Sequence, residues 1–336
     1  MGKTFYRGYA TYLIYGEESV YGTGAVSASN KITKIQTATW TCVNNFIRNQ
    51  GLGDGRNATS AVTGAFDVSG NVDGFIDDPS WLQYVIGKRQ GAGTSADPYE
   101  LVELENIGYG ATDIKSLTLE AGSEGGTDDD ATQISGVVFN SSTITLSQGE
   151  LLGFTADWTG RSVNSTTSLA AYTGSVIKPF VFHSGNVSIG SEAFNCLSAD
   201  VTIANSMNTW RNVGSRFIDQ PVTGLRRYDF NLTFKLNKDD TASTLSGVEL
   251  RDYFYGQANN PSTNPNLTSY AFDVTVQEGA GAGNRVFQIS LENAFFENWS
   301  NPVALEGAPV EVSVSGFALS GETDSTDKIP IRWWTI

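Results

Sequence analysis

A chain of 336 residues is long enough for two domains, and its formal charge of -15 excludes a protein that grips nucleic-acid phosphates through clustered Lys and Arg. Hydrophobic residues make up 40% of the chain and charged residues only 17%, so Ser, Thr, Asn and Gly supply most of its polar character and favour strands over long helices. The two cysteines, Cys42 and Cys196, exclude a multiply cross-linked secreted scaffold, and we expect both to be buried free thiols.

Residues 1–30 are expected to form an N-terminal arm. They combine aromatic residues with the run Glu17-Glu18-Ser19-Val20-Tyr21-Gly22-Thr23 and end in small residues that mark a break in the pattern. The chain does not begin with an apolar segment followed by a small-residue cleavage site, and it contains no run of 18 apolar residues. We therefore expect a protein that is made in the cytosol and does not bind a membrane.

The pattern between residues 31 and 160 predicts a first domain. Alternating residues predict strands at 32–44, where Trp40 and Cys42 share a face, and at 61–76. A short flanking helix is predicted where two Asp residues precede Pro79 and Gly87 follows the last apolar residue. Further strands are predicted at 114–119, 132–139 and 143–146, and a Ser/Thr-rich linker follows at 161–178.

A second domain is predicted at residues 179–320. Its clearest strand is 221–236, where aromatic and aliphatic residues alternate with polar ones from Tyr228 to Leu236. Helical spacing predicts a helix at Gly247 to Tyr255. The remaining predicted strands are 199–205, 272–276, 285–291 and 310–319, and residues 321–336 form a C-terminal arm.

The two halves carry matching residues in the same order, which indicates an internal duplication. Thr41 corresponds to Thr202 at an offset of 161 residues (202 − 41), and Gly64 corresponds to Gly224 at 160 (224 − 64). The tripeptide beginning at Gln133 recurs at Gln288, at an offset of 155 (288 − 133). The fold class is therefore mainly β, with two tandem sandwich-like or barrel-like domains and one short helix flanking each.

No pattern of catalytic, cofactor-binding or metal-ligating residues is found. His183 is the only histidine, so a Ser or Cys nucleophile would have few choices of base. The acidic run Asp128-Asp129-Asp130 lacks the spacing of a calcium loop, and Glu292, Glu297 and Asp252 give no defined glycosidase pair. We predict no enzyme activity, no cofactor and no metal site.

The order of these elements resembles tail tube proteins of long-tailed bacterial or archaeal viruses. The resemblance rests on the N-terminal Glu-Glu-Ser-Val-Tyr-Gly-Thr run, the Val62-Thr63-Gly64 strand, the helix ending in Leu-x-x-Val-Ile-Gly at 82–87 and the closing strand pair. It implies a β-sandwich with a flanking helix and six-domain rings whose strands line a channel for the viral genome. A duplicated chain would then form a ring of three copies with pseudo-sixfold shape.

The same resemblance implies the partners and the location. The chain would bind itself within rings and between stacked rings, and it would contact tape measure, terminator and baseplate proteins of the virion tail. Viral DNA would pass through the channel without sequence-specific binding, because a neutral or acidic lining does not hold phosphates.

Several residues are candidates for roles in such a tube. Polar strand positions are candidates for the channel lining, although alternation does not distinguish the channel from the outer wall: Asp67, Ser69, Asp229, Asn231, Thr233, Asp273 and Thr275. Arg56 and Arg216, in equivalent loops, are candidates for contacts between rings. Ile331, Trp333 and Trp334 would dock the C-terminal arm within the subunit or on a neighbour, since a free terminus seldom exposes such residues.

Three alternatives remain open from the sequence. The first is another ring protein of the same tail, such as a terminator or baseplate hub. The second is a glycan-binding, adhesin-like β-sandwich of the virion surface, for which Trp158 or Trp299 would supply a binding platform. The third, a glycoside hydrolase, lacks an indicated carboxylate pair.

Overall fold

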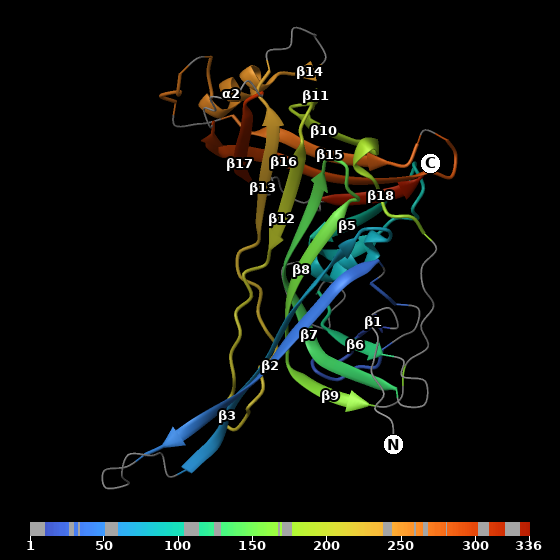
Figure 1. Ribbon diagram of the computed structural model, residues 1–336, viewed down its shortest axis with the longest axis vertical. Coiled ribbons are helices and arrows are strands. Elements are labelled where there is room, and N and C mark those ends of the chain that lie inside the picture. Colours follow the sequence, from blue (N-terminus) through green and yellow to red (C-terminus); the bar gives the residue numbers. More distant parts are fainter. Residues whose placement is uncertain are drawn as a thin grey trace.

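The fold is described from a computed structural model (Figure 1). The described residues are 11–26, 30–32, 34–50, 60–103, 114–123, 129–166, 169, 177–237, 244–258, 260–264, 268–279, 281–301, 309–319 and 330–336.

The first half of the described chain contains nine strands and a short helix, followed by a second half of similar make-up. The elements of the first half are β1 (Thr11–Glu17), β2 (Ile35–Asn49), β3 (Ser60–Phe75), a 3-10 turn (Pro79–Leu82), α1 (Gln83–Ile86), β4 (Gly87–Gln90), β5 (Tyr99–Glu103), β6 (Leu117–Ser123), β7 (Asp130–Ser147), β8 (Gly153–Gly160) and β9 (Ser162–Thr166). Those of the second half are a 3-10 turn (Phe182–Ser184), β10 (Gly185–Ile189), β11 (Glu192–Phe194), β12 (Ser198–Ala204), β13 (Arg227–Lys235), β14 (Thr244–Leu245), α2 (Gly247–Tyr255), β15 (Tyr270–Gln277), β16 (Arg285–Ser300), β17 (Glu311–Leu319) and β18 (Ile331–Thr335).

The two halves repeat the same strand pairings. In the first half, β2 pairs with β3, β3 with β8 and β8 with β7, while β1 pairs with β6, β6 with β7 and β7 with β9. The second half repeats the first series, with β12 paired to β13, β13 to β17 and β17 to β16. It also repeats the second series, with β10 paired to β15, β15 to β16 and β16 to β18. The long strands β7 and β16 therefore each take part in both sheets of their half.

The register of these pairings also repeats. Val72 lies opposite Ala156 in the first half, and Leu232 lies opposite Val314 in the second, at offsets of 160 and 158 residues (232 − 72 and 314 − 156). The bulge of β7 after Phe139 recurs in β16 after Phe296, at an offset of 157 (296 − 139). An offset of 157 places Ser290, rather than the expected Gln288, opposite Gln133 in the comparison of the halves. The expected match is therefore wrong by two residues, which leaves Gln133 and Gln288 on the same face of their strands.

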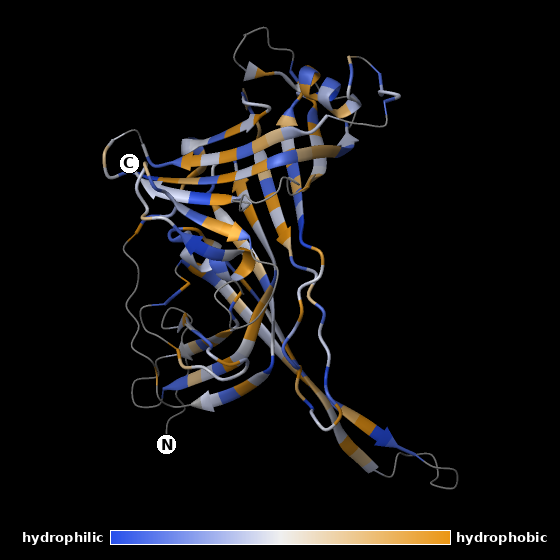
Figure 2. Ribbon diagram, turned by 180° about the vertical axis from the view of Figure 1, so that it is seen from behind, coloured by the Kyte–Doolittle hydropathy of each residue, from blue (hydrophilic) through white to orange (hydrophobic). Residues whose placement is uncertain are grey.

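The core lies between the two sheets of each half and is rich in aromatic residues. Phe230 of β13 stacks on Phe272 of β15 with ring centroids 4.9 Å apart, and Phe296 meets Phe230 edge-on at 5.5 Å. In the first half, Trp81 packs 4.6 Å from Phe154. Along the strands, hydrophobic and hydrophilic residues alternate (Figure 2), which places one set in the core and the other outside.

Local capping explains both helical segments. The Asp78 side chain accepts a hydrogen bond from the Ser80 amide, and Pro79 occupies the first position of the 3-10 turn that leads into α1. At α2, Ser246 and Glu249 form a capping box, and Gly256 ends the helix with φ of 71°. Both helical segments lie where the sequence predicted them, the first from its capping residues and the second from its helical spacing.

The strands differ from the sequence expectations at several places, and three of these differences affect the large sheet. The two strands expected at 132–139 and 143–146 form the single strand β7, because a bulge near Asn140 absorbs the break in alternation. The strand expected from residue 221 begins only at Arg227, since the preceding residues belong to a long loop. Strand β8 was not predicted, and it pairs with both β3 and β7.

The expectation that both thiols are buried is wrong for Cys42. Cys196 is partly buried, whereas Cys42 lies exposed on β2. Strand β2 pairs with β3 along one edge only within the described residues, and most of its length is exposed. The hairpin of β2 and β3 projects from the rest of the molecule (Figure 1), so no core covers this face of the strand.

Candidate functional site

One face of a continuous eight-stranded sheet is lined mainly by short polar side chains, and Phe295 and Phe317 stack on the same face with ring centroids 5.7 Å apart. The strand order is β2, β3, β8, β7, β12, β13, β17 and β16, so this sheet crosses from the first half to the second. One cross-strand row contains Thr155, Thr143, Thr202 and Asp229, and the Thr143 and Thr202 hydroxyl oxygens lie 2.8 Å apart. The face opposite the core is thus polar across the boundary between the halves.

Five of the seven candidate channel residues lie on this polar face. Asp67 and Ser69 are on β3, where Ser69 lies between Thr41 of β2 and Thr159 of β8. Asp229, Asn231 and Thr233 are on β13, and their neighbours Tyr228, Phe230 and Leu232 are buried on the other side of that strand.

Asp273 and Thr275 point the opposite way. Both lie on β15, whose Phe272, Val274 and Val276 are buried. Because Phe272 stacks on Phe230 between the sheets, polar residues of β13 and β15 point to opposite outer surfaces of the same sandwich. The seven candidates are therefore divided between two surfaces, and only the set on β3 and β13 shares one.

The polar face carries more acidic than basic residues at its outward strand positions. Cross-strand register places the following charged residues there: Asp67, Asp73, Asp157, Asp200, Asp229 and Glu311, with Arg227 and Lys235. Arg227 and Asp229 form an exposed ion pair of 3.2 Å. Burial raises the pKa of Asp200 above its ordinary value, opposed by hydrogen bonds with Thr145 and Asn231.

The two halves are joined edge to edge by β7 and β12. Their antiparallel pairing runs from Ser147 opposite Ser198 to Ser141 opposite Ala204. Asn205, which follows β12, is 1% exposed, and its Nδ2 donates to the Val85 carbonyl at 2.8 Å and the Phe139 carbonyl at 3.2 Å. Its Oδ1 accepts from Arg226 Nε at 2.8 Å. Asn205 therefore joins the second half to the helix and the bulged strand of the first.

The sheet ends in two edges that have no strand partner within the described residues. One is the outer edge of β2, and the other is the edge of β16 from Asn298 to Ser300 that lies away from β17. Trp40 of β2 is 37% exposed, whereas Val201, its counterpart on β12, is 1% exposed. The difference arises because β12 lies against the first half, whereas the corresponding edge of β2 has no strand partner among the described residues.

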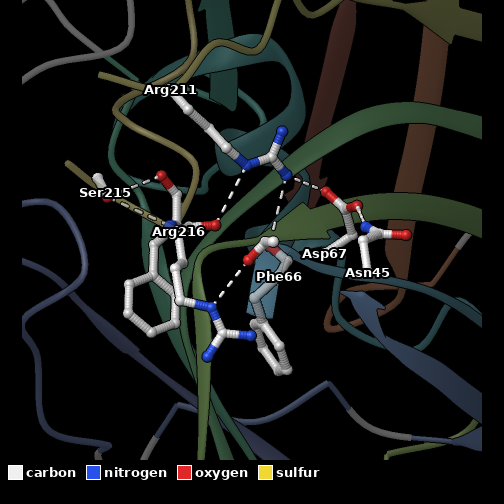
Figure 3. A network of polar contacts seen from close by, with 8 residues as sticks. Asn45, Phe66, Asp67, Arg211, Ser215 and Arg216 are labelled. Atoms are coloured by element: carbon white, nitrogen blue, oxygen red, sulfur yellow. Dashed lines mark hydrogen bonds and ion pairs between the residues drawn. The ribbon is translucent and has the colours of Figure 1, made fainter. Parts of the chain in front are cut away.

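A loop from the second half runs along the projecting hairpin (Figure 1) and is held by two arginines (Figure 3). Arg211 pairs with the Asp67 carboxylate, whose other oxygen accepts from Asn45 at 2.7 Å. Arg216 donates to the Gly64 carbonyl at 2.8 Å and to Asn44 Oδ1. The hairpin is thereby oriented by residues that follow it in sequence by more than a hundred positions.

Two comparisons with known proteins bear on the family of this chain. A family model for the phage tail tube protein matches residues 8–322, nearly the whole chain. The chain belongs to the phage tail tube proteins. No curated protein matches it significantly.

Family membership makes this tail tube protein a structural component of the virion tail that assembles with itself and with other tail proteins. Among the described residues, no three His, Cys, Asp or Glu side chains gather in a way that could hold a metal ion. His183 lies in a 3-10 turn that leads into β10. In the part of the tail tube protein that the structure describes, no helix is long and apolar enough to cross a membrane.

The structure places the remaining candidate residues of the tail tube protein as follows. Ile331 and Trp333 are buried in β18, which pairs with β16 and β5 of the same chain, and Trp334 is partly buried beside them. Arg216 contacts the hairpin of its own chain, and Arg56 lies outside the described residues. Sequence reasoning missed Asn205 as a junction residue, although the offset of 161 residues between Thr41 and Thr202 also relates Asn44 to Asn205. The pairing of β7 with β12 shows what Asn205 does.

Proposed function

We propose that three copies of this tail tube protein form a closed ring that encloses a channel for viral DNA. Each chain supplies two tube domains, at residues 31–160 and 179–320, joined by the linker 161–178. The arms at 1–30 and 321–336 complete them, with β1 and β18 as the parts of those arms that pair within the subunit. Six domains then complete the ring that the family resemblance implies.

The observation that supports the ring is the edge-to-edge junction between β7 and β12. This junction joins two domains of equivalent strand order. The two edges left open at the ends of the sheet belong to β16, the equivalent of β7, and to β2, the equivalent of β12. A head-to-tail interface of this kind repeats from chain to chain until the rotation closes. Unpaired strand edges favour such pairing, because their N–H and C=O groups lack partners.

The polar sheet face is the proposed channel lining, and it includes Asp67, Ser69, Asp229, Asn231 and Thr233. Small hydroxyl and amide groups with an excess of carboxylates do not retain phosphates, so DNA would slide past them. Asp273 and Thr275 face the opposite surface and would lie on the outer wall. Tape measure, terminator and baseplate proteins are the expected further partners.

The lining would have threefold rather than sixfold electrostatic symmetry. Arg227 and Lys235 lie on the polar face of β13, whereas the equivalent positions on β3 are Asp67 and Phe75, at an offset of 160 residues. Alternate domains around the ring would therefore differ in charge.

Electron cryomicroscopy of tubes, from virions or assembled from purified protein, tests this function. We expect rings of three chains, each of 36.1 kDa, with the polar face of β3 and β13 towards the channel. Six chains per ring, or a chain that stays monomeric in every condition and is absent from the tails, would refute the proposal.

A further inference from the structure

We propose that β2 of one copy pairs with the edge of β16 in a second copy, and that Asn44 makes between chains the contacts that Asn205 makes within one. This inference rests on the proposed ring and names the residues that would join its subunits. A second copy of the chain fits the exposed edge of β2, because within one chain the equivalent edge of β12 is already covered by β7 of the first half.

The internal junction fixes the register of the proposed pairing. Ser141 lies opposite Ala204 and Thr143 lies opposite Thr202 where β7 meets β12. The offset from β7 to β16 is 157 residues and that from β12 to β2 is 161. These offsets place Val43 of one copy opposite Asn298 of the other.

The side chains at these positions have matching chemistry. Thr143 and Thr202 bring their hydroxyl oxygens to 2.8 Å across the internal junction, and their counterparts, Ser300 and Thr41, also carry hydroxyl groups. On the other face of β12, Ile203 is 1% exposed, and its counterpart Cys42 is exposed in the single chain. Both faces of β2 are therefore compatible with the surroundings that β12 has.

The hydrogen bonds of Asn44 also match those of Asn205. Each side-chain Oδ1 accepts from an arginine of the long loop, Arg226 for Asn205 and Arg216 for Asn44. Asn205 Nδ2 donates to the carbonyl of Phe139, beside the bulge of β7. Asn44 Nδ2 has no acceptor among the described residues, and the bulge of β16 places Phe296 as the counterpart of Phe139. The Phe296 carbonyl of a second copy is the acceptor that the geometry assigns to Asn44.

Exposed apolar surface is concentrated on the same hairpin. Trp40, Val43, Phe46 and Ile47 are between 37% and 61% exposed on β2, and Val62 on β3 is 56% exposed. Trp40 and Phe46 lie on one face of β2 and Val43 and Ile47 on the other, so both faces of the strand expose apolar side chains that a second copy would cover. The hairpin that carries it projects beyond the body of the chain (Figure 2), which lets it reach across a neighbouring copy.

Disulfide cross-linking tests the register. The variant combines Val43→Cys with Asn298→Cys, both at exposed positions, in a chain with Cys42→Ser and Cys196→Ser. The matched control keeps the natural Cys42, which points to the other face, and combines Asn298→Cys with Cys196→Ser. After oxidation of assembled rings, we expect covalent dimers and closed trimers from the first variant and few from the control, because directly opposed residues lie within disulfide reach.

A second variant tests the role of Asn44 without a disulfide. Asn44→Ala should raise the concentration at which rings dissociate by about tenfold or more, since the buried Phe296 carbonyl of the neighbour would lose its donor. Asn45→Ala, which loses only the bond to Asp67, should shift this concentration by less than about twofold. The free energy of unfolding of the dissociated Asn44→Ala chain should fall by less than about 1 kcal/mol, because within one chain the substitution removes only the exposed bond from Arg216.

The outcomes separate the two proposals. Rings that form normally, give no cross-link between positions 43 and 298 and dissociate equally for both Asn variants would overturn the β2–β16 contact and leave the ring intact. An unaltered chain that forms no ring would instead refute the proposed function.

Discussion

Gly70 of β3 lies directly opposite Trp158 of β8, and the indole occupies the space that a side chain at position 70 would need. A Cβ atom on Gly70 would lie 2.2 Å from Trp158 Cζ2. The second half inverts this arrangement, because the equivalent pair is Phe230 opposite Gly316, and a Cβ on Gly316 would lie 2.6 Å from the Phe230 ring. Each half thus fills the same core position with one aromatic ring, supplied from opposite strands.

The first prediction concerns this inverted pair. Gly70→Ala should lower the free energy of unfolding by about 1–3 kcal/mol, because the added methyl group would meet both the indole and the Thr39 carbonyl oxygen, the latter at 2.4 Å. Gly153→Ala, whose Cβ would meet nothing closer than 3.8 Å, is the matched control and should change it little. Urea unfolding followed by tryptophan fluorescence measures both.

A double substitution extends this test. Gly70→Phe combined with Trp158→Gly copies the arrangement of the second half, so its cost should be smaller than the sum of the two single costs by about 1 kcal/mol or more. Additive costs would show that the two positions do not share one space.

The second prediction concerns the junction between the halves. Asn205→Ala should lower the free energy of unfolding by about 2–3 kcal/mol, because it leaves the buried carbonyls of Val85 and Phe139 without a donor. Asn71→Ala, which removes an exposed hydrogen bond of 2.9 Å to Asp157, is the control and should cost less than about 1 kcal/mol. Equal effects in chemical denaturation would argue against the junction role.

The third prediction is a pH dependence. Hydrogen bonding from Arg285 holds the pKa of Glu278 below its ordinary value of 4.5. A carboxyl whose folded pKa is lowered stabilises the fold fully above its unfolded pKa, and this contribution is lost as the pH falls through the folded pKa. Glu278→Gln should therefore lose less stability than the unaltered chain below pH 4.5. Thermal unfolding midpoints between neutral and acidic pH measure this, and parallel curves would contradict it.

The fourth prediction concerns the two thiols. Burial raises the pKa of Cys196 to about 11, so its thiol should react slowly with a disulfide reagent near pH 8. Cys42 is exposed and should react faster in the dissociated chain. In assembled rings its reaction should slow at least tenfold, because the neighbouring copy covers β2. Cys42→Ser identifies the fast phase, and a rate that assembly does not change would argue against coverage of this face.

Three features are visible in the sequence because they depend on neighbours a few positions away or on simple repetition. They are the alternation from Tyr228 to Phe234, the capping residues around Pro79 together with the helical spacing from Gly247 to Tyr255, and the offset between Thr41 and Thr202. They sufficed to predict a mainly β, duplicated chain and the resemblance to a tail tube family.

Only the tertiary structure decided which surface each polar residue faces and which edges remain open. Asp229 and Asp273 occupy equivalent polar positions in alternating strands, but the stacking of Phe230 on Phe272 turns them to opposite sides. Three other features depend on contacts between residues far apart in the chain. They are the bulge near Asn140, the pairing of β7 with β12 and the burial of Asn205. Alternation shows that a side chain points away from the core, and the packing of the two sheets decides which outer surface it faces.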